Sequence, residues 1–237
     1  MKDEFNPYCP GCLHGVAHRI IAEVLDEQQY RENTIAVLPV GCACLGIFYW
    51  NVDNVNSSHG RAAAVATGIK RCSPENLVFT YQGDGDLAAI GLSETMHAAN
   101  RGENITVFHI NNSIFGMTSG QMSPTTLVGQ KASTCVDGRN PDLAGYPMKM
   151  CEILSQLTAP AYIVRHALDT PADILKAKKS VAKAFRMQME GKGFSFIELL
   201  TNCPTNWGVS PVESLDWMRK NTMVEFPPGV YRDKEGQ

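Results

Sequence analysis

The sequence predicts an α/β fold with a doubly wound, mostly parallel sheet. Helix-like and strand-like segments alternate along the 237 residues, and the strand-like segments are short continuous apolar runs. Such runs are expected where helices cover both faces of a parallel sheet. Apolar residues make up 44% of the chain and charged residues 19%, a mixture typical of globular proteins with enough core to fold without disulfide bonds.

Three helices and three strands are predicted in the first half of the chain. Val16, Ile20 and Val24 recur at helical spacing, whereas the later runs are β-rich or small and Ala-rich. The predicted helices span residues 13–25, 58–71 and 87–99, and the predicted strands span residues 34–40, 77–81 and 105–110.

The second half begins with a long irregular segment. Residues 111–147 are rich in Gly, Ser, Thr and Pro, and a loop of this length inside a compact domain is usually functional. Helices are then predicted at residues 148–157 and 171–189, and strands at residues 161–165 and 194–200. Because no periodicity is clear from Asn221 onward, we expect one domain over residues 1–220 and a C-terminal tail, residues 221–237, that contacts a partner subunit.

Charge and hydropathy exclude several classes of protein. The 21 Lys and Arg against 24 Asp and Glu argue against a nucleic-acid binder, which would carry a basic excess. The uncharged residues 36–50 are interrupted by Pro39, Gly41 and Gly46, so we expect no membrane-spanning segment. The charged residues 1–5 are not followed by an apolar segment, which predicts no secretory leader and a cytoplasmic protein with reduced thiols.

Two polar motifs follow consecutive predicted strands. Gly83-Asp84-Gly85-Asp86 comes after residues 77–81, and Asn111-Asn112 follows with 25 residues between Gly85 and Asn111. Glycines let the backbone approach a phosphate, and Asp84 and Asn112 offer oxygen ligands for Mg²⁺. The alternative is that Gly83–Asp86 is only a tight turn. A dinucleotide site is disfavoured because no Gly-x-Gly-x-x-Gly follows the first strand.

This spacing resembles the thiamine diphosphate fingerprint. The surrounding sequence is similar to the β subunit of 2-oxoacid:ferredoxin oxidoreductases, whose thiamine diphosphate-binding domain residues 1–220 would form. The similar blocks are residues 58–62, 68–70, 81–91, 114–118, 120–122 and 203–208.

The resemblance implies a set of cofactor-binding residues. Asp84, Asn112 and the main-chain carbonyl of Ile114 would hold Mg²⁺. The residues expected to line the diphosphate site are Gly83, Gly85, Asp86 and Thr118. His59 would lie near the thiazolium and the substrate, its alternative being a helix-capping or core histidine. Ser119 stands where glycine is usual, so the loop there must tolerate a side chain.

Eight cysteines form a second pattern. Cys9-x-x-Cys12 fits an iron–sulfur or zinc site, but a zinc ribbon would need a second Cys-x-x-Cys, and the chain has only Cys42-x-Cys44. The resemblance implies a [4Fe–4S] cluster on four cysteines, Cys9, Cys12, Cys42 and Cys203. The other four, Cys44, Cys72, Cys135 and Cys151, are expected to pack as small buried hydrophobes, with Cys44 as a rival ligand.

The resemblance further implies a redox reaction. Thiamine diphosphate would support decarboxylation of a 2-oxoacid, the cluster would pass electrons to ferredoxin, and coenzyme A would take the acyl group. The loop at Phe115-Gly116-Met117-Thr118 and the short N-terminus look most like the 2-oxoisovalerate (branched-chain) type, with 2-oxoglutarate next.

Partner subunits are implied as well. In the family a different subunit supplies the carboxylate that activates the thiamine, so this chain would need an α subunit carrying the pyrimidine-binding domain, together with γ and ferredoxin-like δ subunits. Two alternatives belong to other classes of protein. One is a non-redox thiamine diphosphate lyase or synthase subunit, and the other is a zinc-stabilised binding module in which Gly83–Asp86 is only a turn.

Overall fold

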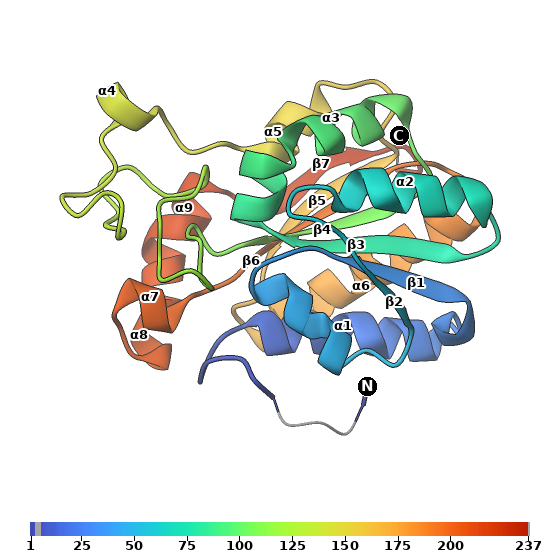
Figure 1. Ribbon diagram of the computed structural model, residues 1–237, viewed down its shortest axis with the longest axis horizontal. Helices are drawn as coiled ribbons and strands as arrows, with labels where there is room; N and C mark the ends of the chain where they lie inside the picture. Colours follow the sequence, from blue (N-terminus) through green and yellow to red (C-terminus); the bar gives the residue numbers. More distant parts are fainter. Residues whose placement is uncertain (3–5, 237) are drawn as a thin grey trace.

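The computed structural model describes residues 1–2 and 6–236 and contains one twisted sheet covered by helices on both faces (Figure 1). Within these residues, seven strands follow the order β2-β1-β3-β4-β6-β5-β7, and all neighbours are parallel except the pair of β5 and β7. The strands are β1 (Thr34–Leu38), β2 (Asp53–Asn56), β3 (Leu77–Gly83), β4 (Thr106–Asn111), β5 (Tyr162–Ala167), β6 (Ser195–Leu200) and β7 (Gly229–Asp233). The predicted mostly parallel α/β sheet is therefore confirmed.

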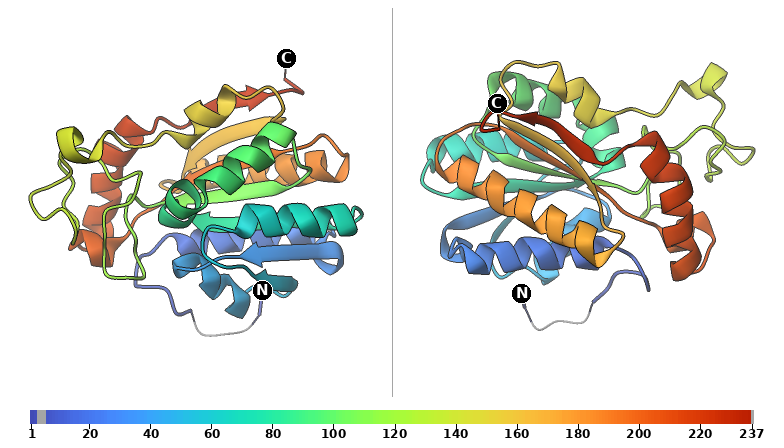
Figure 2. Two further views of the ribbon diagram at one scale, coloured as in Figure 1. Left: turned by 45° about the horizontal axis from the view of Figure 1, so that its top comes forward. Right: turned by 180° about the vertical axis from the view of Figure 1, so that it is seen from behind.

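Two groups of helices sandwich this sheet (Figure 2). One face is covered by α1 (His14–Glu27) and α6 (Pro171–Met189), which contact each other, and the other face by α2 (Ala62–Cys72), α3 (Leu92–Arg101) and α5 (Met150–Ser155). Shorter helices lie in the connections: α4 (Pro141–Ala144), α7 (Pro204–Trp207), α8 (Pro211–Trp217), α9 (Met223–Glu225), the 3₁₀ turns η1 (Arg31–Asn33) and η2 (Cys42–Phe48), and the π turns η3 (Gly85–Ile90) and η4 (Met218–Thr222).

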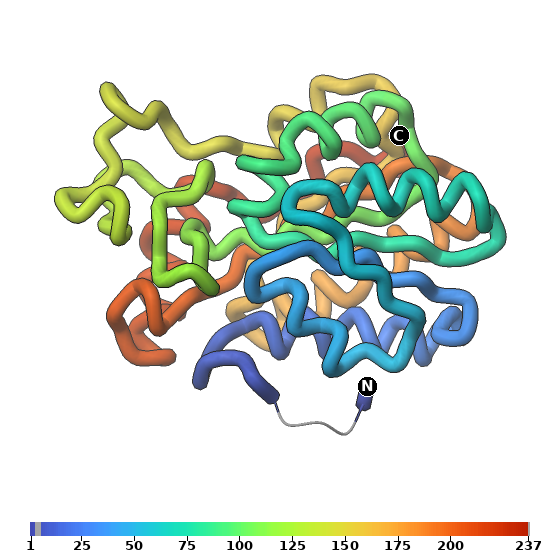
Figure 3. Tube along the Cα trace, viewed as in Figure 1, coloured from blue at the N-terminus to red at the C-terminus, as the bar shows by residue number. Residues whose placement is uncertain are grey.

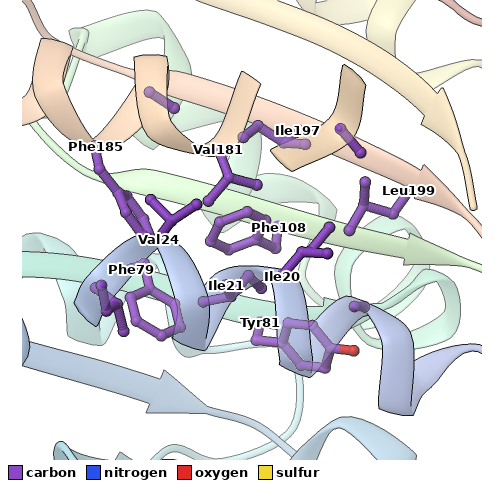
Figure 4. Close-up of a cluster of buried hydrophobic side chains, with 14 of the residues drawn as sticks. Ile20, Ile21, Val24, Phe79, Tyr81, Phe108, Val181, Phe185, Ile197 and Leu199 are labelled. Carbon is purple, nitrogen blue, oxygen red and sulfur yellow. The ribbon is translucent and has the colours of Figure 1, made fainter. Parts of the chain in front are cut away.

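The larger core lies between the sheet and the layer of α1 and α6. Figure 4 shows Ile21 of α1 and Phe185 of α6 packed around Phe108 of β4, and all three side chains are fully buried. The side chains of a strand point alternately to the two faces of the sheet. In β3, Phe79 therefore packs in this core and Val78 packs in the core beneath α2 and α3. Burial of this kind stabilises the fold, since truncating one buried phenylalanine to alanine typically costs about 3–5 kcal/mol.

Most predicted elements are confirmed, and one prediction is wrong. The helix predicted at residues 171–189 coincides with α6, where the hydroxyl of Thr170 accepts a hydrogen bond from the backbone N–H of Asp173. By contrast, residues 87–99 do not form a single helix, because η3 ends at Ile90 and α3 begins at Leu92, with Gly91 between them. The backbone N–H of Gly91 donates to the carbonyl of Asp86, a π-type hydrogen bond that widens the turn.

Sequence patterns missed the two strands at the sheet edges, β2 and β7. The four residues of β2, Asp-Asn-Val-Asn, show no apolar alternation. They form a strand by pairing in parallel with β1. In the tail, β7 adds antiparallel to β5, and Lys183 of α6 forms an ion pair with Asp233. Part of the tail thus packs on its own sheet, while its contact with a partner subunit stays a prediction.

Two predictions concern the ends of the chain and its hydropathy. Residues 3–5, part of the segment used to predict the absence of a leader, and residue 237 of the tail lie outside the described residues. Among the helices that the structure describes, none combines the length and the apolar character that a bilayer crossing requires.

Candidate functional site

The two polar motifs meet at the carboxyl edge of the sheet. Gly83 at the end of β3 pairs with Ile110 near the end of β4, which brings the residues after both strands together. A cavity of about 110 Å³ opens there. Its lining includes all eight residues proposed for the diphosphate, metal and thiazolium: His59, Gly83, Asp84, Gly85, Asp86, Asn112, Ile114 and Thr118.

Asp84 is the buried carboxylate of this cavity. Its Oδ1 accepts a hydrogen bond from the backbone N–H of Gly85 at 2.8 Å, and its Oδ2 accepts from the hydroxyls of Ser123 at 2.7 Å and Thr125 at 2.5 Å. Burial raises the pKa of Asp84 to about 6, although these donors oppose the shift. A cation bound beside the carboxylate would remove the cost of burying its charge.

Asn112 approaches the same cavity from the end of β4. Its side-chain Oδ1 accepts from the backbone N–H of Ile114 at 3.2 Å, and its carbonyl accepts from the indole N–H of Trp207 at 3.2 Å. The carboxylate of Asp84, the amide oxygen of Asn112 and the carbonyl of Ile114 are hard oxygen ligands of the kind that Mg²⁺ prefers.

Gly85 lies at the cavity wall beside Asp84, and its lack of a side chain makes room for Phe115. A Cβ atom built on Gly85 would overlap the ring of Phe115, which also lines the cavity. Any other residue at position 85 would therefore displace that ring.

His59 lies at the cavity wall rather than in the core, with about a third of its side chain exposed. Its Nδ1 forms a hydrogen bond with the carboxylate of Asp86, which also accepts from the backbone N–H of Gly60 and the amide of Gln82, both at 2.7 Å. Burial raises the pKa of Asp86, and these donors and His59 offset part of that effect. Because Asp86 takes Nδ1, only Nε2 of His59 remains for a ligand in the cavity.

The rim of the cavity is formed by the turn after Ile114. Thr118 is exposed, and its hydroxyl donates to the side chain of Gln121 at 2.5 Å. Ser119 has φ +79°, in the left-handed region that favours glycine. The turn therefore keeps a glycine-type backbone and accommodates the serine side chain in a strained conformation.

The four proposed cluster cysteines line a second cavity of about 220 Å³: Cys9, Cys12, Cys42 and Cys203. Cys44 is not among the residues that line it. Burial and the neighbouring thiols raise the pKa of Cys12 and of Cys42 to about 12. Among residues 1–2 and 6–236, no three His, Cys, Asp or Glu side chains are close enough to share one metal ion, so the thiols surround a cavity rather than a point.

The two cavities adjoin. They share five lining residues: His14, Cys42, Asn112, Gly116 and Met117. A Cβ atom built on Gly116 would lie 3.5 Å from Sγ of Cys42, 3.6 Å from Sγ of Cys203 and 3.6 Å from the amide nitrogen of Asn112. Gly116 thus lies between two of the thiols and the side chain of Asn112.

The remaining cysteines differ from expectation. Cys151 is buried as predicted, but Cys72 is exposed, and Cys44 and Cys135 are only partly buried. The prediction of four buried packing cysteines is therefore wrong for three of them. Cys72 is the last residue of α2, at the end of the helix away from the core, and Cys135 lies in the long loop.

Sequence reasoning missed the two hydroxyls on Asp84. Ser123 and Thr125 lie 39 and 41 residues after Asp84, and no local pattern links them to it. The sequence indicated a role for them only through their position in residues 111–147, the irregular segment expected to be functional.

Comparison with known proteins shows the family of this chain. Residues 40–199 match the family model described as thiamine pyrophosphate enzyme, C-terminal TPP binding domain. The chain is 46% identical over 230 residues to the ketoisovalerate oxidoreductase subunit VorA of Methanothermobacter marburgensis, covering 97% of this chain and 48% of that protein. It therefore spans about half the length of this relative.

Two further relatives cover more of their own length. The 2-oxoglutarate synthase subunit KorB of Methanocaldococcus jannaschii is 34% identical over 223 residues, covering 91% of this chain and 78% of that protein. The fold is similar to a 2-oxoglutarate:ferredoxin oxidoreductase from Magnetococcus marinus solved with 2-oxoglutarate, coenzyme A and succinyl-CoA bound. The TM-score is 0.81 at 24% identity, covering 98% of this chain and 82% of that chain. The chain therefore belongs to the thiamine pyrophosphate enzyme family and, within it, to the β subunits of 2-oxoacid:ferredoxin oxidoreductases.

Proposed function

We propose that this chain is the thiamine diphosphate-binding β subunit of a coenzyme A-acylating 2-oxoacid:ferredoxin oxidoreductase. The enzyme would decarboxylate a 2-oxoacid oxidatively and pass the electrons through a [4Fe–4S] cluster to ferredoxin. One observation carries the proposal: a cavity with Mg²⁺-type oxygen ligands adjoins a cavity lined by four thiols, and both are lined by Cys42 and Asn112.

The oxygen-lined cavity fits the diphosphate of the cofactor and its Mg²⁺. Asp84, Asn112 and the carbonyl of Ile114 would hold the metal ion, and Gly85 would line the diphosphate site. Gly83, Asp86 and Thr118 would complete the lining around the diphosphate. When bound, thiamine diphosphate supplies the electron sink for decarboxylation.

His59 is the proposed catalytic residue. The hydrogen bond between Nδ1 and the accepting carboxylate of Asp86 holds the imidazole at the cavity wall, so Nε2 can donate to or accept from a substrate oxygen. The apolar side chains of Ile114, Phe115 and Met117 line the same cavity.

The thiol-lined cavity fits a cluster better than a single zinc ion. Four cysteines surround about 220 Å³, whereas tetrahedral zinc needs four ligands within about 2.3 Å of one point. Iron–sulfur clusters spread four thiolates over a larger cubic core. The high thiol pKa values of Cys12 and Cys42 reflect burial without a metal, and bound iron would keep these groups as thiolates.

We propose 2-oxoisovalerate as the substrate, with 2-oxoglutarate next. The VorA relative is named a ketoisovalerate oxidoreductase subunit, and the KorB relative a 2-oxoglutarate synthase subunit. Val40, Phe115 and Met117 line the cavity, and no lysine or arginine is among the described residues that do. A branched aliphatic chain suits such a wall, whereas the second carboxylate of 2-oxoglutarate would need a cationic or polar partner.

The complete enzyme would need further subunits and a reducing compartment. We propose an α subunit with the pyrimidine-binding domain, γ and ferredoxin-like δ subunits, and a soluble ferredoxin as electron acceptor, all in the cytoplasm. All eight cysteines are free thiols, which suits a compartment that keeps thiols reduced.

The test is cofactor analysis of the complex purified without oxygen, followed by ferredoxin reduction with a panel of 2-oxoacids and coenzyme A. We expect thiamine diphosphate, Mg²⁺ and iron, with activity highest for 2-oxoisovalerate and no activity from this chain alone. Thiamine diphosphate without a cluster on this chain would support the non-redox lyase or synthase instead. Zinc without thiamine diphosphate would support the binding module.

A further inference from the structure

The long loop after β4 contains two buried hydroxyl groups that form hydrogen bonds with Asp84. The hydroxyls of Ser123 and Thr125 both donate to Oδ2 and lie 3.1 Å from each other. Ser123 is 2% exposed and Thr125 is fully buried, so water does not compete for these hydrogen bonds. The orientation of the Asp84 carboxylate therefore depends on where residues 123–126 lie.

Thr126 connects this segment to the turn that carries Asn112. Its hydroxyl donates to the carbonyl of Ser113 at 2.7 Å and accepts from the backbone N–H of Ser123 at 2.8 Å. Ser113 follows Asn112 directly, so the same short segment touches the residues after β3 and those after β4.

Arg139 holds the segment from its other side. Arg139 is 5% exposed, and six main-chain carbonyls accept from its five N–H groups at distances between 2.7 and 3.3 Å, with the two hydrogens of Nη1 shared among three of them. Three of the carbonyls belong to Ser123, Pro124 and Thr126, and the other three to Ala144, Gly145 and Tyr146. One buried cation thus ties residues 123–126 to the far end of the loop, which Figure 3 shows extending away from the sheet.

We propose that Arg139 is a positioning residue for the metal site, acting through Ser123 and Thr125. The inference rests on the proposed function, in which Asp84 binds the Mg²⁺ of thiamine diphosphate. Arg139 would fix residues 123–126 by their carbonyls, and the two hydroxyls would then hold the Asp84 carboxylate ready for the ion. Lysine cannot replace it, because an ammonium has three donors on one nitrogen and the guanidinium has five in a planar fork.

The test is a Mg²⁺ titration of thiamine diphosphate binding by the purified complex, followed by calorimetry. A Ser123→Ala, Thr125→Val double variant should need about 10–100-fold more Mg²⁺ for half-maximal binding, the usual effect of removing partners that orient a metal ligand. Arg139→Lys should shift the midpoint in the same direction. Ser133→Ala, an exposed serine in the same loop, should leave the midpoint unchanged.

The outcomes separate this inference from the proposed function. If the wild-type complex binds no thiamine diphosphate with Mg²⁺, the proposed function is wrong. If wild type binds and Asp84→Asn does not, while the double variant and Arg139→Lys keep the wild-type midpoint, the function stands and the positioning role is wrong. A lower melting temperature with an unchanged midpoint would likewise leave only a structural role. Should Arg139→Lys fail to fold, an unchanged midpoint in the double variant still overturns the inference, because Arg139 is proposed to act through those two hydroxyls.

Discussion

Arg165 and Glu198 form a fully buried ion pair across β5 and β6, with Nε of the guanidinium 2.7 Å from Oε2 of the carboxylate. The other oxygen of Glu198 accepts from the amide of Asn111 at 2.8 Å, one residue before Asn112. Burial pushes the pKa of Glu198 upward, but the charge of Arg165 and the hydrogen bond from Asn111 outweigh that effect and the pKa ends below its usual value. The carboxylate therefore stays charged.

Replacing Glu198 by glutamine should destabilise the chain strongly. The variant leaves the buried guanidinium of Arg165 with only Glu152 as a charged partner, and breaking a buried pair typically costs about 3–5 kcal/mol. Urea unfolding measures the change in the free energy of unfolding. Glu190→Gln is the matched control, because its ion pair with Arg186 is exposed and should be worth less than about 0.5 kcal/mol. Equal effects of the two variants would contradict the prediction.

His109 should make the chain sensitive to mild acid. It is fully buried on β4, neither ring nitrogen has a hydrogen-bond partner among the described residues, and burial lowers its pKa to about 4. As pH falls below 6.5, the unfolded chain binds a proton that folded His109 does not, so the free energy of unfolding falls.

Between pH 7 and pH 5 this histidine should account for a loss of about 2 kcal/mol. The measurement is the difference between the free energies of unfolding at the two pH values, compared between wild type and His109→Leu. The variant should lose less stability than wild type over this interval. An identical pH dependence would mean that His109 is not held neutral by burial.

Cys42 and Cys44 should differ in their effect on iron binding. Cys42 lines both cavities and Cys44 lines neither, although only one residue separates them. Cys42→Ser should lose most of the iron, whereas Cys44→Ser should keep about four irons per chain. Iron analysis and the visible absorption of the anaerobically purified chain provide the measurement. Loss of the cluster in Cys44→Ser alone would reverse the assignment of ligands.

Ser119→Gly should stabilise the chain. The backbone at Ser119 has φ +79°, and a non-glycine residue held in that region typically costs about 1–3 kcal/mol, partly offset by the greater flexibility of glycine when unfolded. We expect a net gain of about 1 kcal/mol in the free energy of unfolding by urea denaturation. Ser133→Gly is the control, since Ser133 is not among the described residues with positive φ and should lose stability. A destabilised Ser119→Gly chain would show that the position carries no strain.

Several features of the site were predictable because their signals are local. Gly83–Asp86 and the pair Asn111-Asn112 each follow a buried strand, and strand formation itself carries them to one edge of the sheet. Cys9 and Cys12 are close in sequence, and Cys42 and Cys203 were found through family resemblance. The structure brings these four thiols around one cavity.

Other features were not predictable, because they depend on contacts between distant segments. The six hydrogen bonds of Arg139 go to main-chain carbonyls. Every residue type has such a carbonyl, so the sequence does not indicate which ones accept. The edge strands β2 and β7 pair through backbone groups, so their side chains need not follow a strand pattern. The π turn at Gly85–Ile90 arises where Gly91 packs against the backbone of Gly60, again a contact between distant residues.

The sequence by itself determined the alternation of strands and helices, the residues at the carboxyl edge of β3 and β4, and the family resemblance. Its apolar periodicity and motif spacing are local properties that any fold of this chain must satisfy. Only the tertiary structure decided that the oxygen-lined and thiol-lined cavities adjoin at Cys42 and Asn112, and that Ser123 and Thr125 orient Asp84. Those relationships are set by the packing of the 111–147 loop and α7 against the sheet, and packing depends on the whole chain at once.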